Sequence, residues 1–240
     1  MKIAVSTTCS DGYSIFLDHH IKSILKHNPD FNKPYYVFCD ARLCETNRKH
    51  FLKLYPGFIF KDIKFEEYEK NYKESIKYYS MEAFQLSEYD RVVYWGTDML
   101  CLKSLNPLWE LCEQPIKIAM TKERRRGAFL PYNNGGMIIG SELLNESTYN
   151  NLMGYDIDSK DGKLKDQKLY NYFFMGQITE IPLKFNTLVS EVDFISWDEI
   201  IMLHYIFKPY MDGINRLTDK QIKVWREYDC PDGVFSEVIC

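Results

Sequence analysis

Short apolar runs separate longer amphipathic stretches in the first part of the chain. Four of these runs are rich in β-branched and aromatic side chains, namely residues 2–6, 35–39, 57–60 and 92–95. Continuous apolar runs of this length predict strands that are buried on both faces of a sheet.

Between the runs, apolar side chains recur every three or four positions, which is the spacing of one helix face. The first stretch carries Leu17, Ile21, Ile24 and Leu25, and the third carries Ile76, Tyr79, Ala83 and Leu86. The second spans residues 46–54 and ends before a Pro-Gly pair. Strands that alternate with helices predict a mainly parallel sheet, because right-handed crossovers return each strand in the same direction.

Beyond residue 95 the alternation is less regular. Strands are predicted at residues 116–120, 136–140 and 200–205, and a helix at residues 164–174. A chain of 240 residues with 45% hydrophobic content can bury one core, although two small lobes remain an alternative. We predict an α/β fold, a single Rossmann-like domain over residues 1–240 with a mainly parallel central sheet flanked by helices. Residues 211–240 are expected to form a C-terminal extension that packs on this domain.

The composition indicates a cytoplasmic protein. No apolar run approaches the roughly 18–20 residues of a membrane span, and the first residues have the pattern of a strand rather than a signal peptide. The seven cysteines lie partly in apolar strands, as Cys39 and Cys101 do, which favours reduced core thiols over a zinc site. A net charge of −4 gives no general attraction to nucleic acid, and one local basic segment lies at residues 122–126.

The strand at residues 92–95 runs directly into a carboxylate. Thr97 and Asp98 follow it, and the chain turns apolar again at Leu100. Ligands of open α/β sheets bind at the carboxyl ends of the strands, so Asp98 is the first candidate for chemistry. The structural alternative is that Asp98 caps the next turn or accepts backbone N–H groups.

The turn at residues 7–13, after the first strand, is expected at the same edge of the sheet. It ends in Tyr13, and an aromatic ring at this edge can stack on a planar base. The alternative is a surface tyrosine that packs on its own helix. Asp11, in the same turn, can equally serve as a helix N-cap.

Two polar segments occur later in the chain. Asn-Asn-Gly-Gly at residues 133–136 precedes an apolar strand. Its glycines allow a ligand to approach the backbone closely, and Asn-Gly is also a strong signal for a hairpin turn. Asp166 and Gln167 begin a predicted helix, where they can bind either free backbone N–H groups or the hydroxyl groups of a ligand.

A histidine, His204, closes the apolar run of the last predicted strand. A histidine in this position is more often a buried structural residue than a ligand. An imidazole nitrogen, a carboxylate oxygen and phosphate oxygens would also suit a divalent ion such as manganese.

Taken in order, these segments resemble the motifs of glycosyltransferase family 8, the glycogenin-like retaining transferases with a GT-A fold. Residues 7–13 match the family motif Thr-Thr-Asn-Asp-x-Tyr with one extra residue, and residues 94–98 match a strand that ends Asp-x-Asp. Residues 133–139 match Asn-Ser-Gly-Val, and residues 166–174 match the family's Asp-Gln helix. Residues 203–210 match a shortened form of the signature apolar-His-Phe/Tyr…Lys-Pro-Trp. The resemblance covers roughly residues 1–210.

The resemblance implies transfer of a sugar from a UDP-sugar to an acceptor hydroxyl, with retention of anomeric configuration and with Mn²⁺ or Mg²⁺. It implies that Asp98 and His204 bind the metal, and that Asp166, Gln167 and Asn134 contact the sugar as catalytic residues. The implied contacts to the donor nucleotide are Thr7, Thr8, Tyr13, Thr97, Asp98 and Lys208. The acceptor stays open between glycan, protein and modified nucleic acid, and a homodimer is a further open alternative.

The chain departs from the family pattern at several positions. Gly96 replaces the first acid of Asp-x-Asp, so one implied contact to metal and ribose is missing, and Lys163 replaces a second acid that touches the sugar. Two other hypotheses follow. One is a noncatalytic relic that binds nucleotide sugars, and the other is a glycosyltransferase that acts on a modified base in viral DNA and binds phosphates through Lys122 and residues 124–126.

Overall fold

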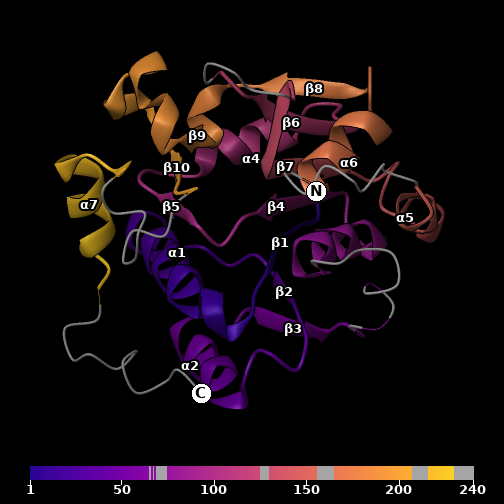
Figure 1. Ribbon diagram of the computed structural model, residues 1–240, viewed down its shortest axis with the longest axis horizontal. Coiled ribbons are helices and arrows are strands. Elements are labelled where there is room, and N and C mark those ends of the chain that lie inside the picture. The colour runs from indigo at the N-terminus through magenta and orange to yellow at the C-terminus, as the bar shows by residue number, and fades with distance from the viewer. Residues whose placement is uncertain are drawn as a thin grey trace.

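A seven-stranded sheet runs through the centre of the computed structural model, which describes residues 1–64, 66, 68, 75–124, 130–155, 165–206 and 216–229 (Figure 1). In spatial order the strands are β3 (Phe58–Asp62), β2 (Tyr35–Cys39), β1 (Ile3–Thr8), β4 (Arg91–Trp95), β7 (Tyr132–Gly140), β6 (Ile118–Lys122) and β8 (Ile178–Ile181). The first four are parallel, and β7 pairs antiparallel with both β4 and β6. Because β6 and β8 are parallel, β7 alone among the described strands of this sheet is reversed. The predicted α/β fold with a mainly parallel sheet is confirmed.

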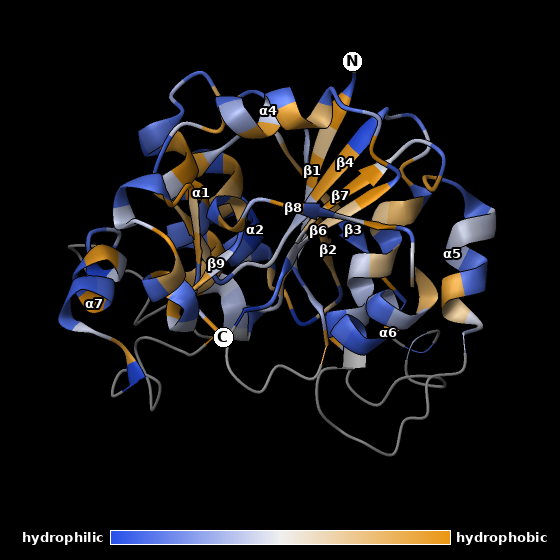
Figure 2. Cartoon of the chain, turned by 90° about the horizontal axis from the view of Figure 1, so that it is seen from above, coloured by the Kyte–Doolittle hydropathy of each residue, from blue (hydrophilic) through white to orange (hydrophobic). Residues whose placement is uncertain are grey.

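Helices cover both faces of the sheet, as Figure 1 shows. One face packs against α1 (Ser14–His27), α2 (Glu45–Leu54) and α4 (Asn106–Cys112). The other face packs against the 3-10 helix η2 (Ser75–Gln85), α5 (Glu146–Met153) and α6 (Lys165–Phe173). Figure 2 shows the consequence for hydropathy, since the central strands are apolar while the helices turn hydrophilic residues outward.

Alternation along β1 assigns its side chains to the two layers. Ile3 and Val5 pack with the α1 layer, and Ala4 between them packs with the η2 layer. The predicted core thiols Cys39 and Cys101 are buried and free, and burial raises the pKa of each to about 12.

A second, three-stranded sheet lies beside the first. It consists of β5 (Met99–Cys101), β10 (Met202–His204) and β9 (Thr187–Leu188), with β10 antiparallel to β5 and parallel to β9. This pairing places His204 opposite Met99, and the backbone N–H of Tyr205 donates to the carbonyl of Asp98 at 2.7 Å. The remaining short helical turns are η1 (Asp11–Tyr13), η3 (Leu183–Phe185), η4 (Val189–Phe194) and η5 (Trp197–Glu199).

The last described helix, α7 (Asp219–Arg226), packs on α1. It begins with a capping box between Thr218 and Gln221. The indole ring of Trp225 lies 5.2 Å from the Phe16 ring. Of the extension predicted at residues 211–240, only residues 216–229 are described.

The third predicted helix is present, as the 3-10 helix η2. One local prediction was wrong. Residues 133–135 do not form a turn, because they lie inside β7, opposite a register shift between Met120 and Thr121 of β6. Pairing of β7 before and after these residues overrides the strong Asn-Gly turn signal, and the carbonyl of Gly135 accepts the backbone N–H of Gly96 at 2.7 Å. Within the part of the chain that the structure describes, no helix combines the length and apolarity of a bilayer span.

Candidate active site

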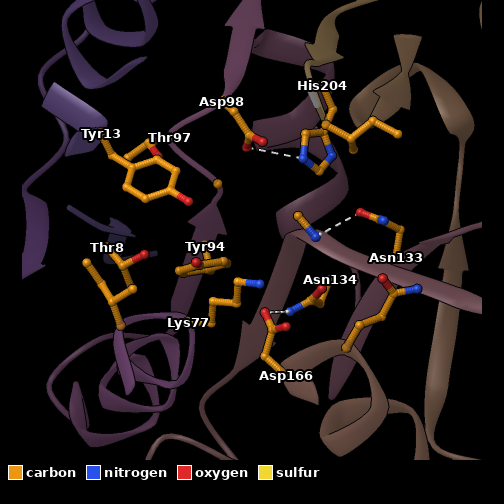
Figure 3. A pocket seen from close by; sticks show the side chains of 15 residues that line it. Thr8, Tyr13, Lys77, Tyr94, Thr97, Asp98, Asn133, Asn134, Asp166 and His204 are labelled. Carbon is orange, nitrogen blue, oxygen red and sulfur yellow. Dashed lines mark hydrogen bonds and ion pairs between the residues drawn. The ribbon is translucent and has the colours of Figure 1, made fainter. Parts of the chain in front are cut away.

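A cavity of about 380 Å³ opens at the carboxyl ends of β1 and β4 (Figure 3). The predicted site residues that line it are Thr8, Tyr13, Thr97, Asp98, Asn134, Asp166, Gln167 and His204. They come from five segments far apart in the sequence, and the fold brings them together as the resemblance implied.

Two predicted nucleotide contacts do not join this group. Thr7 is fully buried and its side chain does not line the cavity, because strand alternation turns it away from the side of Thr8. Its hydroxyl is buried in the core and has no hydrogen-bond partner among the described residues. Lys208 lies outside the described residues.

Tyr13 forms one end of the cavity, next to Thr97 (Figure 3). Its half-buried ring also lies 5.8 Å from the ring of Phe16, so it packs on its own helix and faces the cavity at the same time. Asp11 turns away from the cavity. Its carboxylate accepts the backbone N–H of Cys44 at 2.9 Å and the side-chain amide of Asn47 at 2.7 Å, and so binds the start of α2.

Asp98 and His204 meet in the middle of the cavity. Asp98 Oδ1 lies 3.2 Å from His204 Nε2, and the other ring nitrogen, Nδ1, lies 2.9 Å from Asn186 Oδ1. Among the described residues no group of three His, Cys, Asp or Glu side chains suited to a metal comes together. The protein therefore offers a carboxylate oxygen and an imidazole nitrogen, a donor pair that fits Mn²⁺ or Mg²⁺ if a ligand and water complete the shell.

Gly96 leaves room that Asp98 uses. A Cβ atom at Gly96 would lie 2.8 Å from Asp98 Oδ1 and 3.9 Å from His204 Nε2. The carboxylate of Asp98 thus occupies space that a side chain at residue 96 would need. An acid at residue 96 would therefore require the Asp98 carboxylate to move.

Two of the three glycines of β7, Gly135 and Gly136, allow the second sheet to approach the first. A Cβ atom at Gly135 would lie 2.2 Å from Cε1 and 2.6 Å from Nδ1 of His204, and one at Gly136 would lie 3.2 Å from Cβ of Asn186. The imidazole ring rests directly on the backbone of β7. Glycine is required at residue 135 for the observed position of the ring.

Asp166 and Asn134 form the other end of the cavity. The side-chain amide of Asn134 donates to Asp166 Oδ2 at 2.7 Å. Burial raises the pKa of Asp166 above its ordinary value, although the hydrogen bond from Asn134 and the charge of Lys77 act in the opposite direction. The backbone N–H groups of residues 166 and 167, at the start of α6, also lower the pKa of this carboxyl.

The side-chain amide of Gln167 makes hydrogen bonds within the protein as well as lining the cavity. Its amide nitrogen donates to Glu123 Oε2 at 2.7 Å and to the carbonyl oxygen of Tyr132 at 2.8 Å. The amide nitrogen therefore ties the start of α6 to the end of β6 and to β7.

Three residues of the site went unrecognised in the sequence. Lys77 and Tyr94 line the cavity, and Figure 3 shows Lys77 between Tyr94 and Asp166. Lys77 belongs to the polar face of η2, and a lysine there looks like any solvent-facing residue. Asn186 lies behind His204 in an irregular segment, where no periodic pattern marks it.

The basic segment at residues 122–126 gives the nucleic-acid hypothesis no support in its described part. The guanidinium group of Arg124 lies 3.3 Å from a carboxylate oxygen of Glu180, and its backbone N–H donates to Glu191. Arg125 and Arg126 lie outside the described residues.

Comparison with known proteins gives a consistent result. The model of the family described as Glycosyl transferase family 8 matches residues 4–212. No match was found among curated proteins.

Several solved structures share the fold. One is the galactosyltransferase LgtC in complex with donor and acceptor sugar analogues, with 18% identity, a TM-score of 0.69, and coverage of 98% of this chain and 99% of LgtC. Another is the glycosyltransferase GlyE of Streptococcus pneumoniae TIGR4, with 19% identity and a TM-score of 0.75, where 99% of this chain spans 63% of GlyE. Mouse xyloside xylosyltransferase 1 has 15% identity and a TM-score of 0.55, with coverage of 85% of this chain and 97% of the mouse chain.

At these identities the structural matches show the fold alone, and they confirm that it is the GT-A fold. The family match covers far more than half of the 240 residues, and the cavity holds motif residues from each of its segments. The chain belongs to glycosyltransferase family 8.

Proposed function

We propose that the protein is a retaining glycosyltransferase that moves a sugar from a UDP-sugar to an acceptor hydroxyl with the help of Mn²⁺ or Mg²⁺. One observation carries the proposal. A single cavity holds an aromatic ring at one end, a carboxylate–imidazole pair in the middle and a buried acid–amide pair at the other end (Figure 3). This order matches the base, diphosphate and sugar of a nucleotide sugar.

Each part of the donor has a partner in the described residues. Tyr13 stacks on the uracil ring, and Thr8 and Thr97 hydrogen-bond the nucleotide. Asp98 and His204 would hold a divalent ion, which would supply positive charge to the diphosphate leaving group. Lys208 is proposed to add to that charge.

Asp166 and Asn134 act on the sugar. Breaking the glycosidic bond builds positive charge at the anomeric carbon, and a carboxylate near it stabilises that charge. Asn134 holds the Asp166 carboxylate in one direction and keeps an amide oxygen for a sugar hydroxyl. We assign Asp166 as a stabiliser rather than a nucleophile, and we infer front-face attack by the acceptor, whose proton passes to the diphosphate.

A panel of UDP-sugars with and without Mn²⁺ tests the proposal. The donor at 100 times its dissociation constant should stabilise the protein by about 2.7 kcal/mol, visible as a rise in the thermal unfolding midpoint. The donor should also be slowly hydrolysed, or transferred when an acceptor is supplied. Binding of UDP without hydrolysis or transfer from any UDP-sugar would instead support the noncatalytic relic.

Asp166→Asn separates catalysis from binding. It should abolish most turnover while UDP affinity stays within about twofold, because the nucleotide end of the cavity is unchanged. Asp30→Asn, at an exposed position in a loop, is the matched control and should behave as the unmodified protein. Full turnover in Asp166→Asn would remove Asp166 from the reaction.

A further inference from the structure

Three hydrogen bonds connect the imidazole ring of His204 to a backbone N–H group. The N–H of Gly135 donates to Asn133 Oδ1 at 2.9 Å, and the side-chain amide of Asn186 donates to the same oxygen at 2.9 Å. Asn186 Oδ1 in turn lies 2.9 Å from His204 Nδ1. All three side chains are buried, with Asn186 only 1% exposed.

The chain of bonds has a single consistent direction. A backbone N–H can only donate, so the atom of Asn133 that faces Gly135 is its oxygen. That oxygen also faces Asn186, which must present its NH₂ group there and therefore turns its own oxygen toward His204. The hydrogen of the neutral His204 ring is then on Nδ1, and Nε2 keeps a free lone pair.

Asp98 favours the opposite arrangement. Its Oδ1 lies 3.2 Å from His204 Nε2, and a carboxylate at that distance would accept a hydrogen from Nε2. Asp98 and His204 would then satisfy each other, and neither would be left to bind a cation. Two neighbours of the same ring thus compete for its one hydrogen.

We propose that Asn186, held by Asn133, is a positioning residue that keeps the hydrogen of neutral His204 on Nδ1 and so leaves Nε2 and Asp98 as two acceptors facing each other. Two facing acceptors attract a cation between them, which makes the pair a metal site instead of a hydrogen bond. The part that concerns the metal rests on the proposed function, whereas the part that concerns the ring does not.

The position of the ring hydrogen is measurable in the metal-free protein. Long-range ¹H–¹⁵N correlation spectra distinguish the two ring nitrogens of each of the five histidines, and the spectrum of His204→Asn assigns the signals of His204. At a pH high enough that the ¹⁵N shifts no longer change, the unmodified protein should carry its hydrogen on Nδ1. In Asn186→Leu the hydrogen should move to Nε2, where Asp98 accepts it.

Metal binding provides a second readout. Binding of Mn²⁺ alone and of Mn²⁺ with UDP, followed by electron paramagnetic resonance, should be about 10–100-fold weaker in Asn186→Leu, because partners of this kind typically contribute that much to affinity. Asn186→Asp keeps an acceptor for Nδ1 and should retain the hydrogen there. Asn28→Leu is the control, because Asn28 is another buried asparagine. It lies at the end of α1, where its side-chain oxygen accepts the backbone N–H of Leu105. This variant should leave both the ring hydrogen and Mn²⁺ binding unchanged.

A hydrogen on Nε2 in the unmodified metal-free protein overturns the proposal, and this measurement decides the matter even if neither variant folds. The proposal is also overturned if Asn186→Leu folds and keeps both the Nδ1 hydrogen and its Mn²⁺ affinity. If the hydrogen is on Nδ1 but no UDP-sugar is turned over, the proposed function fails while the role of Asn186 in fixing the ring stands.

Discussion

Gly135→Ala tests the position of His204 with the smallest change that the chain allows. The added Cβ atom would lie 2.2 Å from Cε1 and 2.6 Å from Nδ1 of the imidazole ring, whereas ordinary contacts begin near 3.4 Å. The ring is the end of a side chain and can move, whereas the backbone of β7 is held by β4 on one side and β6 on the other. We therefore expect the ring to shift by about 1 Å and the fold to stay intact.

A shift of that size should change the free energy of unfolding little and the catalytic rate strongly. Overpacking costs about 1–3 kcal/mol, and the lower end applies where a side chain can yield. Metal ligands tolerate only about 0.2 Å of displacement, and a 1 Å error in a catalytic group can cost about 100-fold in rate. We expect Gly135→Ala to lose about 100-fold in Mn²⁺-dependent kcat/KM, equivalent to about 2.7 kcal/mol.

Gly140→Ala is the matched control in the same strand. Its Cβ atom would lie 2.1 Å from the backbone carbonyl oxygen of Ile116, which cannot move without the chain around it. Urea unfolding should show a larger loss of stability than for Gly135→Ala, while the turnover per folded molecule stays near that of the unmodified protein. If Gly135→Ala keeps its Mn²⁺-dependent rate, or if Gly140→Ala loses as much per folded molecule, the reasoning about the ring is wrong.

Three further predictions address the nucleotide, the metal and acid stability. Tyr13→Ala should weaken UDP binding by about 1 kcal/mol, or about fivefold, in calorimetry, and Tyr13→Phe should not, because the ring supplies the stacking; equal affinities would place the base elsewhere. Asp98→Asn should lose most Mn²⁺-dependent turnover with little change in thermal unfolding, and full activity of the unmodified enzyme in EDTA would contradict a metal role. Burial lowers the pKa of His19 and of His20 from 6.5 to about 4, so the folded state favours the neutral rings. The free energy of unfolding should therefore fall as the pH drops from 6.5 to 4, by up to about 3 kcal/mol for each ring, and His20→Asn should remove about half of that slope in urea titrations; an unchanged slope would show that His20 is not the cause.

The first four strands and the ligand-binding edge could be predicted because long apolar runs carry a strong signal. The junction that completes the site could not. The strand predicted at residues 200–205 is present as β10, but Asp98 and His204 meet through its pairing with β5, which has three residues and is too short to show a period. Asn186 was missed for a related reason, since its role depends on two partners, Asn133 and His204, that are brought together only by the fold.

Local signals failed where tertiary contacts outweighed them. The Asn-Gly of residues 134–135 predicts a turn, yet the segment stays in β7, where β6 pairs with Asn133 before it and Met137 after it, and β4 pairs from Gly136 onward. The position of the Thr7 side chain outside the cavity could have been foreseen, because two consecutive residues of a strand point to opposite faces and only one of the two threonine side chains can face the cavity. The periodic spacing from Ile76 to Leu86 indicated a helix correctly but could not distinguish an α-helix from a 3-10 helix.

The boundary of the shared family sequence and the boundary of the packed unit do not coincide. The family match ends at residue 212, whereas Trp225 of α7 packs on Phe16 and on His19 of α1. Phe16 is also the ring on which Tyr13 rests. A segment beyond the family match thus shares one aromatic neighbour with the proposed base platform, so a substitution of Trp225 would act on Tyr13 through Phe16 without changing any residue that lines the cavity.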